Sequence, residues 1–243
     1  MFAYVGIAGL FFSAILILAP IKLSRAGKAR WKGKYVSMCY FSCLGAGFII
    51  IELVFVQIFM KLIGFPIYTY SVVIFTMLMS AATGSLAAKT FNISPRKYWA
   101  TPFIGVMAYG TVLLLGHSIT IDIFLNASLP VRILCAAVMI FPLGFFMGMP
   151  FPLGILSLRD QPSGAIAWAW GMNGLFTVLG GMMTGLLSIF YGFKTTFLVA
   201  IVIYLLSFVF FSRLRLTTEV DAARETPPSN TAALVYEPPQ AGF

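Results

Sequence analysis

The chain has 243 residues, of which 60% are hydrophobic and only 9% carry a charge. A soluble domain of this length needs about 25% charged residues to cover its surface, so the composition excludes an ordinary soluble protein and indicates one surrounded mostly by hydrocarbon. The formal net charge of +9 would suit a nucleic-acid-binding protein, but the basic residues stand beside apolar runs, where such residues contact lipid headgroups and set orientation.

Apolar runs long enough to cross a bilayer recur along the chain. A span needs about 20 mostly apolar residues to cross a hydrocarbon core about 30 Å thick. The pattern predicts an all-α transmembrane bundle of about seven spans within residues 1–212, followed by a polar, Pro-rich cytoplasmic tail, 213–243, that is disordered unless a partner binds it. Segment 117–130 is too polar to span and is predicted as an outer loop. The predicted spans are 2–21, 36–60, 67–88, 99–117, 131–157, 165–190 and 194–212.

The charges around these spans predict their orientation. No basic residue precedes the first apolar run and no small-residue cleavage site ends it, so we expect a retained span rather than a signal peptide. Six basic residues follow it within 22–34, and Lys and Arg are enriched in cytoplasmic loops. The N-terminus is therefore predicted outside and the C-terminus inside. Thirteen Lys and Arg residues then lie inside and three outside, and all four tryptophans map to the cytoplasmic interface. The outer three are Lys61, Arg132 and Lys194; the tryptophans are Trp31, Trp99, Trp168 and Trp170.

One acidic residue, Glu52, lies near the middle of the second predicted span, and Gln57 follows it in the same apolar run. An ionised carboxylate at that depth costs about 2.5–3.5 kcal/mol, so Glu52 should be protonated, paired or turned toward a wet cavity. Two roles stay open: a proton or cation relay, or an interhelical hydrogen bond, for example to Asn173, that specifies packing.

The fifth predicted span contains three prolines, Pro142, Pro150 and Pro152, which predict a kink or break between about 142 and 152. Broken helices mark binding sites in many transporters, and they also shape helix packing. Glycines four residues apart let helix backbones approach closely. They occur in the fifth and sixth predicted spans and predict that these two helices pack together. The glycines are Gly144, Gly148, Gly181 and Gly185.

Residues that could carry catalysis or hold a metal are not clustered in the sequence. Cys39, Cys43 and Cys135 fall within predicted spans and imply neither a disulfide framework nor a metal site. His117 is the only histidine. Because no nucleotide-binding loop, nucleophile elbow or zinc signature occurs, we expect no enzymatic activity, no metal and no cofactor. The 16% aromatic content would also suit lipid or pigment bound between the helices.

Three stretches in order, 40–85, 142–155 and 167–181, resemble a known family. They contain a Gly-x-Pro-x-Tyr turn that begins at Gly64, a Met-Gly-Met-Pro-Phe-Pro-Leu-Gly stretch and a Trp-Gly-x-Asn-Gly stretch. Residues 36–212 are similar to the C-terminal membrane region of bacterial spermidine-synthase-like multi-span proteins. Family members usually carry a Rossmann-like aminopropyltransferase-type domain upstream, and nothing in this chain corresponds to it. The resemblance therefore implies kinship and a bacterial inner membrane, but not polyamine synthesis.

These features favour a non-catalytic integral membrane subunit that packs against or anchors a larger membrane complex, or associates with itself. Its expected partners are the lipid bilayer and other membrane proteins, with no nucleic acid. The alternative is a transporter or channel element that uses Glu52 and the broken fifth helix. A membrane-embedded enzyme acting on lipid or quinone is a third hypothesis, but the clustered His or acidic residues that such chemistry needs do not occur.

Overall fold

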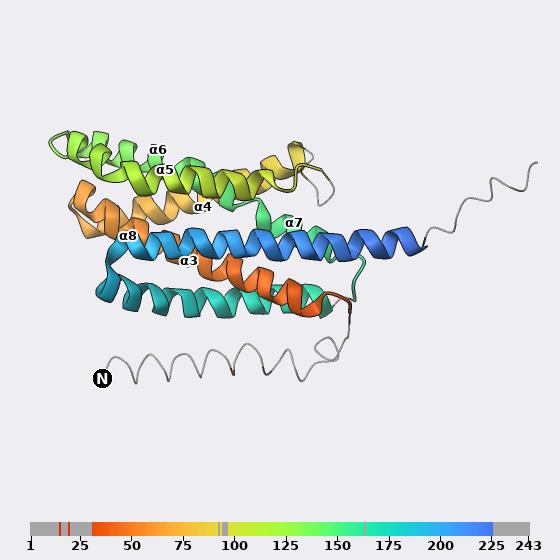
Figure 1. Cartoon of the computed structure of the whole chain (residues 1–243). Helices are drawn as coiled ribbons and strands as arrows, with labels where there is room; N and C mark the ends of the chain where they lie inside the picture. Colours follow the sequence, from red (N-terminus) through yellow and green to blue (C-terminus); the bar gives the residue numbers. More distant parts are fainter. Residues whose placement is uncertain are drawn as a thin grey trace, which may run out of the picture.

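The computed structural model describes residues 15, 19, 31–91, 93, 97–162 and 164–225, with the backbone alone for 217–225. Every regular element in this described part is a helix, so the predicted all-α class is confirmed there. The long helices lie side by side as a bundle (Figure 1). In chain order they are α3 (Lys34–Ile63), α4 (Pro66–Thr90), α5 (Thr101–Phe124), α6 (Leu129–Met147), α7 (Pro150–Ser157) and α8 (Gly164–Glu225).

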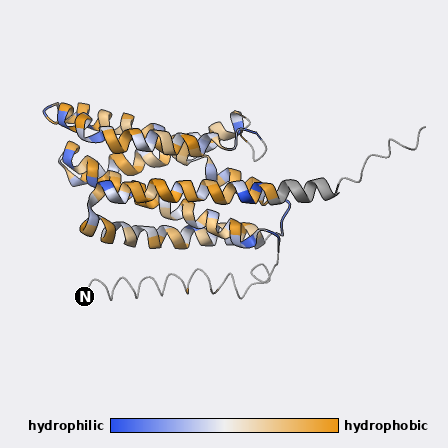
Figure 2. Cartoon of the chain, in the orientation of Figure 1, coloured by the Kyte–Doolittle hydropathy of each residue, from blue (hydrophilic) through white to orange (hydrophobic). Residues whose placement is uncertain are grey.

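Five helical stretches of the described chain are long and apolar enough to cross a membrane. Apolar residues cover the length of the bundle and polar residues gather at its two ends (Figure 2). Hydrocarbon surroundings favour such a bundle, because each helix satisfies its own backbone hydrogen bonds and presents apolar side chains to the lipid. The predicted span 2–21 lies outside the described residues, except for Ile15 and Ala19. The five stretches are Lys34–Ile63, Pro66–Thr90, Thr101–Phe124, Leu129–Ser157 and Gly164–Leu216.

The central helix of the bundle is α3, which packs against each of the other helices that the structure describes. Apolar side chains cover all of its sides, as is typical of a helix surrounded by others. Tyr40, Ile50, Val54 and Leu62 are fully buried at different positions around its axis. The helix ends at Gly64, whose φ of 83° is a left-handed conformation that glycine adopts without steric cost.

The last element, α8, consists of two helices joined at Gly192, where φ is 77° and ψ is 168°. The two parts run in opposite directions (Figure 1), and Gly192 lies between the predicted spans 165–190 and 194–212. Across the turn, the Ser188 hydroxyl donates to Thr196 Oγ1 at 3.4 Å. Both parts pack against α3 through glycines, since Gly180 of α8 adjoins α3 and Gly47 of α3 adjoins the second part of α8.

Two helices extend beyond the predicted boundaries because polar residues continue them. Segment 117–130 was predicted as a loop, but α5 continues to Phe124. The His117 ring and the Thr120 hydroxyl each donate to a carbonyl one turn earlier in α5, which satisfies them within the helix. The sequence predicts a tail from residue 213 that is disordered unless a partner binds it, whereas α8 continues to Glu225. Ala, Arg and Glu there favour helix, which ends just before Pro227.

Aromatic and basic side chains from separate segments meet at one end of the bundle. Lys34 Nζ lies 4.7 Å from the ring centroid of Trp31 and 4.9 Å from that of Trp168. The Arg215 guanidinium lies 5.2 Å from the ring centroid of Trp99. The cation–π contacts of Lys34 join the first turns of α3 and α8. The contact of Arg215 joins the second part of α8 to the segment before α5.

Candidate functional site

One membrane-length helical stretch of the described bundle, Leu129–Ser157, is interrupted between α6 and α7. The interruption lies at Gly148 and Met149, whereas Pro142 lies inside α6. A proline has no N–H, so Pro152 cannot donate to the carbonyl four residues earlier, that of Gly148. Such carbonyls at membrane depth need a partner or a polar cavity.

Two tyrosine hydroxyls from other helices bind the backbone close to these prolines. The Tyr40 hydroxyl of α3 donates to the Pro150 carbonyl at 2.6 Å, where both groups are buried. The Tyr109 hydroxyl of α5 donates to the Met139 carbonyl at 3.2 Å. The broken helix is therefore fixed from both sides by side chains, and its irregular backbone is part of the packed structure.

Up to the interruption, α6 lies directly against α4. A Cβ added to Gly84 would meet the backbone of Phe145, and one added to Gly148 would meet the backbone of Ala81. A Cβ added to Gly144 would meet the side chain of Ser80. The predicted glycine spacing in this span therefore serves the contact between α6 and α4.

Beyond the interruption, α7 turns toward α3 and α8. Gly154 of α7 lies against the rings of Tyr40 and Phe41, where a Cβ would clash. The Phe151 ring packs on Trp170 of α8, with ring centroids 4.6 Å apart. Because α6 packs against α4 whereas α7 packs against α3 and α8, the chain moves away from α4 at the prolines. A space is left between α4 and α7.

A hollow of about 300 Å³ lies at this position. Its walls come from α3, α4, α6, α7 and α8, and include Gly148, Pro152 and Asn173. Polar side chains in the wall, among them Ser85, Asn173 and Tyr204, form no side-chain hydrogen bond within the part of the chain that the structure describes. The hollow therefore combines an apolar lining with a few polar groups available to a ligand, as is typical of small-molecule sites.

A second hollow of about 620 Å³ adjoins the first and shares Ser85, Phe151 and Pro152 with it. Its other walls are apolar residues of α4 and α7, together with Ile93 and the side chain of Lys89 in the last turn of α4. We call the two spaces together the α4–α7 groove. It runs from the interior of the bundle at Asn173 to the basic end of α4.

The structure does not bring the predicted polar residues together. Asn173 lines the α4–α7 groove, but Glu52 and Gln57 are not among its lining residues. Glu52 is half-buried on α3, two turns after Gly45, which contacts the first part of α8. It lies on the same face of α3 as that glycine. The Oε1 atom of Gln57 is buried without a hydrogen-bond partner among the described residues.

The fifth predicted span meets the sixth through the Phe151–Trp170 contact of α7 and α8 and not through the glycines singled out for it. Gly144 and Gly148 contact α4, as described above, while a Cβ on Gly181 would lie 3.8 Å from Ile49 and Leu53 of α3. A Cβ on Gly185 would meet no heavy atom within 4 Å in the described part. Spacing shows that a helix has a small face, but it does not identify the neighbour.

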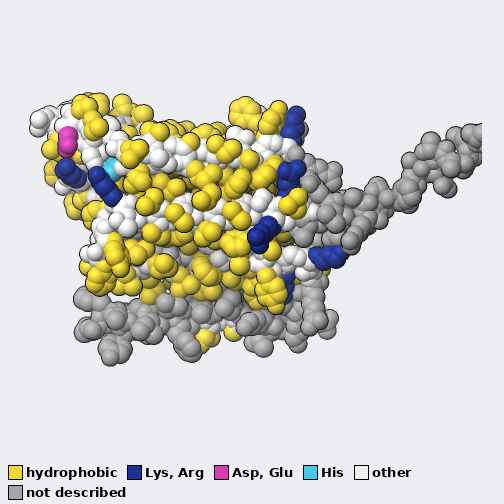
Figure 3. Space-filling view, in the orientation of Figure 1, with side chains coloured by type: hydrophobic (Ala, Val, Ile, Leu, Met, Phe, Trp, Pro, Cys, Tyr) yellow, Lys and Arg dark blue, Asp and Glu magenta, His cyan; other side chains and the backbone are white. Residues whose placement is uncertain are grey.

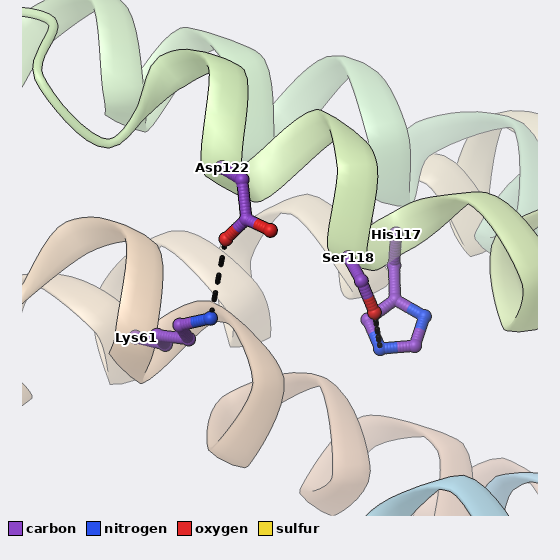
Figure 4. Close-up of polar contacts among 4 residues, drawn as sticks. All are labelled: Lys61, His117, Ser118 and Asp122. Atoms are coloured by element: carbon purple, nitrogen blue, oxygen red, sulfur yellow. Dashed lines mark hydrogen bonds and ion pairs between the residues drawn. The ribbon is translucent and has the colours of Figure 1, made fainter.

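The opposite end of the bundle carries a separate set of polar contacts (Figure 4). Lys61 Nζ of α3 lies 3.3 Å from Asp122 Oδ1 of α5, and both side chains are about two-thirds exposed, at 65% and 64%. His117 is buried; its Nδ1–H donates to the Leu113 carbonyl at 2.9 Å, which leaves Nε2 to accept from the Ser118 hydroxyl at 3.4 Å. No group of three or more metal-ligating side chains occurs among the residues that the structure describes.

Several residues of this site were not singled out in the sequence. Tyr40, Tyr109, Ser85 and Lys89 act through neighbours that lie far away in the chain. A tyrosine within an apolar span was a usable signal, because its hydroxyl needs a partner when buried. Comparisons of this chain with protein-family models, with curated proteins and with solved structures find no match.

Proposed function

We propose that this chain is a non-catalytic, multi-pass subunit of a bacterial cytoplasmic membrane that packs against a second membrane protein. The observation that carries the proposal is an open glycine face on the first part of α8, formed by Gly174, Gly181 and Gly185. Added Cβ atoms at Gly174 and Gly185 would meet nothing within 4 Å in the described part, and Gly181 has only ordinary contacts. Seven and four residues separate these glycines, so they lie on one side of the helix.

Such a face is unfavourable unless another helix covers it. Each glycine in a helix interior costs about 1 kcal/mol relative to alanine, and contact with lipid alone gives no reason to retain three on one side. Small residues let a second helix approach closely, and helix association in membranes depends on this packing. The neighbouring Val178 is 40% exposed on the same side, so the face is accessible at its centre.

The topology that we propose has about seven spans, with the N-terminus outside and the C-terminus inside. Because α8 reverses at Gly192, the described part supplies six crossings, and the predicted span 2–21 supplies the seventh. Basic side chains gather at the two ends of the bundle, with more at one end than the other (Figure 3). The positive-inside rule assigns the richer end to the cytoplasm. That end carries Lys32, Lys34, Lys89, Lys97, Arg159, Arg213 and Arg215; the other carries Lys61, Arg132 and Lys194.

Site-specific photocrosslinking in native membranes tests the subunit proposal. A photoreactive amino acid at Val178 probes the open glycine face, and the same residue at Val112 of α5, which is 61% exposed, is the matched control. We expect a heteromeric product from Val178 and none from Val112. A product made only with a second copy or with residues 2–21, or equal products from both positions, would refute the proposal.

A second experiment tests orientation separately. Single cysteines replace Arg159, between α7 and α8, and Asn126, between α5 and α6, in a chain without its native cysteines. A membrane-impermeant thiol reagent added to intact cells should label position 126 and not position 159. The reverse pattern would invert the proposed topology without affecting the subunit proposal.

A further inference from the structure

We propose that the α4–α7 groove binds one anionic glycerophospholipid, with the phosphate at Lys89 and one acyl chain lying along α7 toward Phe151. This inference goes beyond the proposed subunit function and does not depend on a protein partner.

The dimensions and walls of the groove suit an acyl chain. The two hollows measure about 300 and 620 Å³, within the usual range of about 300–1,000 Å³ for ligand sites. They share Ser85, Phe151 and Pro152, so a chain can pass from one to the other. Along the larger hollow most of the wall is apolar and includes Leu86 of α4 and Ile155 and Leu156 of α7. A hydrocarbon chain is the ligand that such walls accept without loss of hydrogen bonds.

The only charged lining residue fixes the end of the α4–α7 groove at which the lipid headgroup would bind. Lys89 is the single charged residue that lines either hollow, and it lies in the last turn of α4. It forms no ion pair within the described residues, so its ammonium is available to an anion. No carboxylate lines the groove to repel a phosphate. A lipid phosphate accepts charge-assisted hydrogen bonds from lysine, and an anionic lipid attracts the ammonium more strongly than phosphatidylcholine does, because the choline cation offsets the phosphate charge.

A second polar contact fits the chemistry of a glycerophospholipid. Ser85 precedes Lys89 by one helical turn, a rise of about 6 Å along α4, and both residues line the larger hollow. Its hydroxyl is not hydrogen-bonded within the part of the chain that is described. The ester carbonyls of a glycerophospholipid lie just inside its phosphate, so the Ser85 hydroxyl is placed to donate to one of them. A fatty acid or a simple phosphate ion could not use both groups and the apolar wall together.

The test is native mass spectrometry of the purified full-length chain in a neutral detergent. The protein is titrated with phosphatidylglycerol or with phosphatidylcholine of identical acyl chains, and the fraction carrying one lipid is measured. We expect tighter binding of phosphatidylglycerol, and a loss of about fivefold in that preference for Lys89→Gln, the effect of one basic residue near an anionic lipid. Arg159→Gln is the control, because Arg159 is exposed beside the same end and does not line the groove.

Two further measurements distinguish binding of the acyl chain in the groove from attraction of a lipid to a basic protein surface. Leu156 is 49% exposed, so Leu156→Trp should fill the larger hollow without disturbing the core and should reduce the binding of both lipids. Excess inorganic phosphate should not displace the lipid. The proposal is overturned if Lys89→Gln and Arg159→Gln behave alike, if folded Leu156→Trp binds lipid as the parent does, or if phosphate competes.

Discussion

Gly84→Ala tests whether α4 and α6 are held at backbone contact. The added Cβ would lie 2.8 Å from the Phe145 carbonyl carbon and 3.1 Å from its Cα, and closer still to the carbonyl oxygen. Ordinary contact begins near 3.4 Å, and backbone atoms cannot rotate away as a side chain can. The two helices must therefore separate, which also disturbs the contacts of Gly144 and Gly148 with α4.

The magnitude follows from two opposing effects. Overpacking costs about 1–3 kcal/mol, and a clash with backbone lies at the upper end of that range. Alanine regains about 1 kcal/mol of helix propensity over glycine. We therefore expect the free energy of unfolding to fall by about 1–2 kcal/mol. The matched control is Gly185→Ala, which meets open space in the described part and should be neutral or stabilise the isolated chain by up to about 1 kcal/mol.

Unfolding in mixed micelles of a neutral detergent and dodecyl sulfate, followed by tryptophan fluorescence, gives both free energies. Gly84→Ala should lose stability, and Gly185→Ala should not. If Gly84→Ala is as stable as the parent, or if both variants lose stability equally, the close contact between α4 and α6 is refuted.

The same assay checks three other features. Tyr40→Phe removes the hydroxyl that binds the Pro150 carbonyl and should lower the free energy of unfolding by about 1 kcal/mol. Tyr204 is also buried but forms no hydroxyl hydrogen bond in the described part, so Tyr204→Phe should cost less. Equal losses would contradict the role of the hydrogen bond. Gly192→Ala should lose about 1 kcal/mol, because φ is 77° at the turn of α8; unchanged stability would show that the turn relaxes. Asp122→Asn should change stability by less than about 0.5 kcal/mol, since its ion pair with Lys61 is about two-thirds exposed; a larger loss would mean that the pair is shielded from solvent.

The sequence predicts the helices of this protein better than their neighbours. Hydrophobic length is a local property, so α3 and α4 lie close to the spans predicted at 36–60 and 67–88. The sequence does not predict the extension of α5 to Phe124, because a polar segment such as 117–130 is typical of a loop. In a helix that projects past the hydrocarbon, polar side chains can hydrogen-bond to the turn before them and continue the helix.

Contacts between helices depend on information that no single segment contains. Gly144 and Gly148 have the same spacing as Gly181 and Gly185, yet the first pair contacts backbone and side chains of α4 while Gly185 has open space in the described part. Which faces meet depends on the direction and rotation of whole helices. For the same reason, the hydroxyls of Tyr40 and Tyr109 could be expected to find partners, but not at the Pro150 and Met139 carbonyls in particular.

Glu52 and the broken helix suggested transport because both are costly in a membrane, and the structure gives them different surroundings. The contacts around the interruption account for it. Glycines allow α6 to pack closely against α4, and α7 leaves α4 after the prolines. The hydroxyls of Tyr40 and Tyr109 donate to carbonyls nearby. Glu52 lies on the face of α3 that is turned toward the first part of α8. On the first part of α8, the Thr177 and Thr184 hydroxyls donate to carbonyls within their own helix. Glu52 itself forms neither a hydrogen bond nor an ion pair within the described residues, so no contact there favours a relay over an interhelical hydrogen bond that specifies packing.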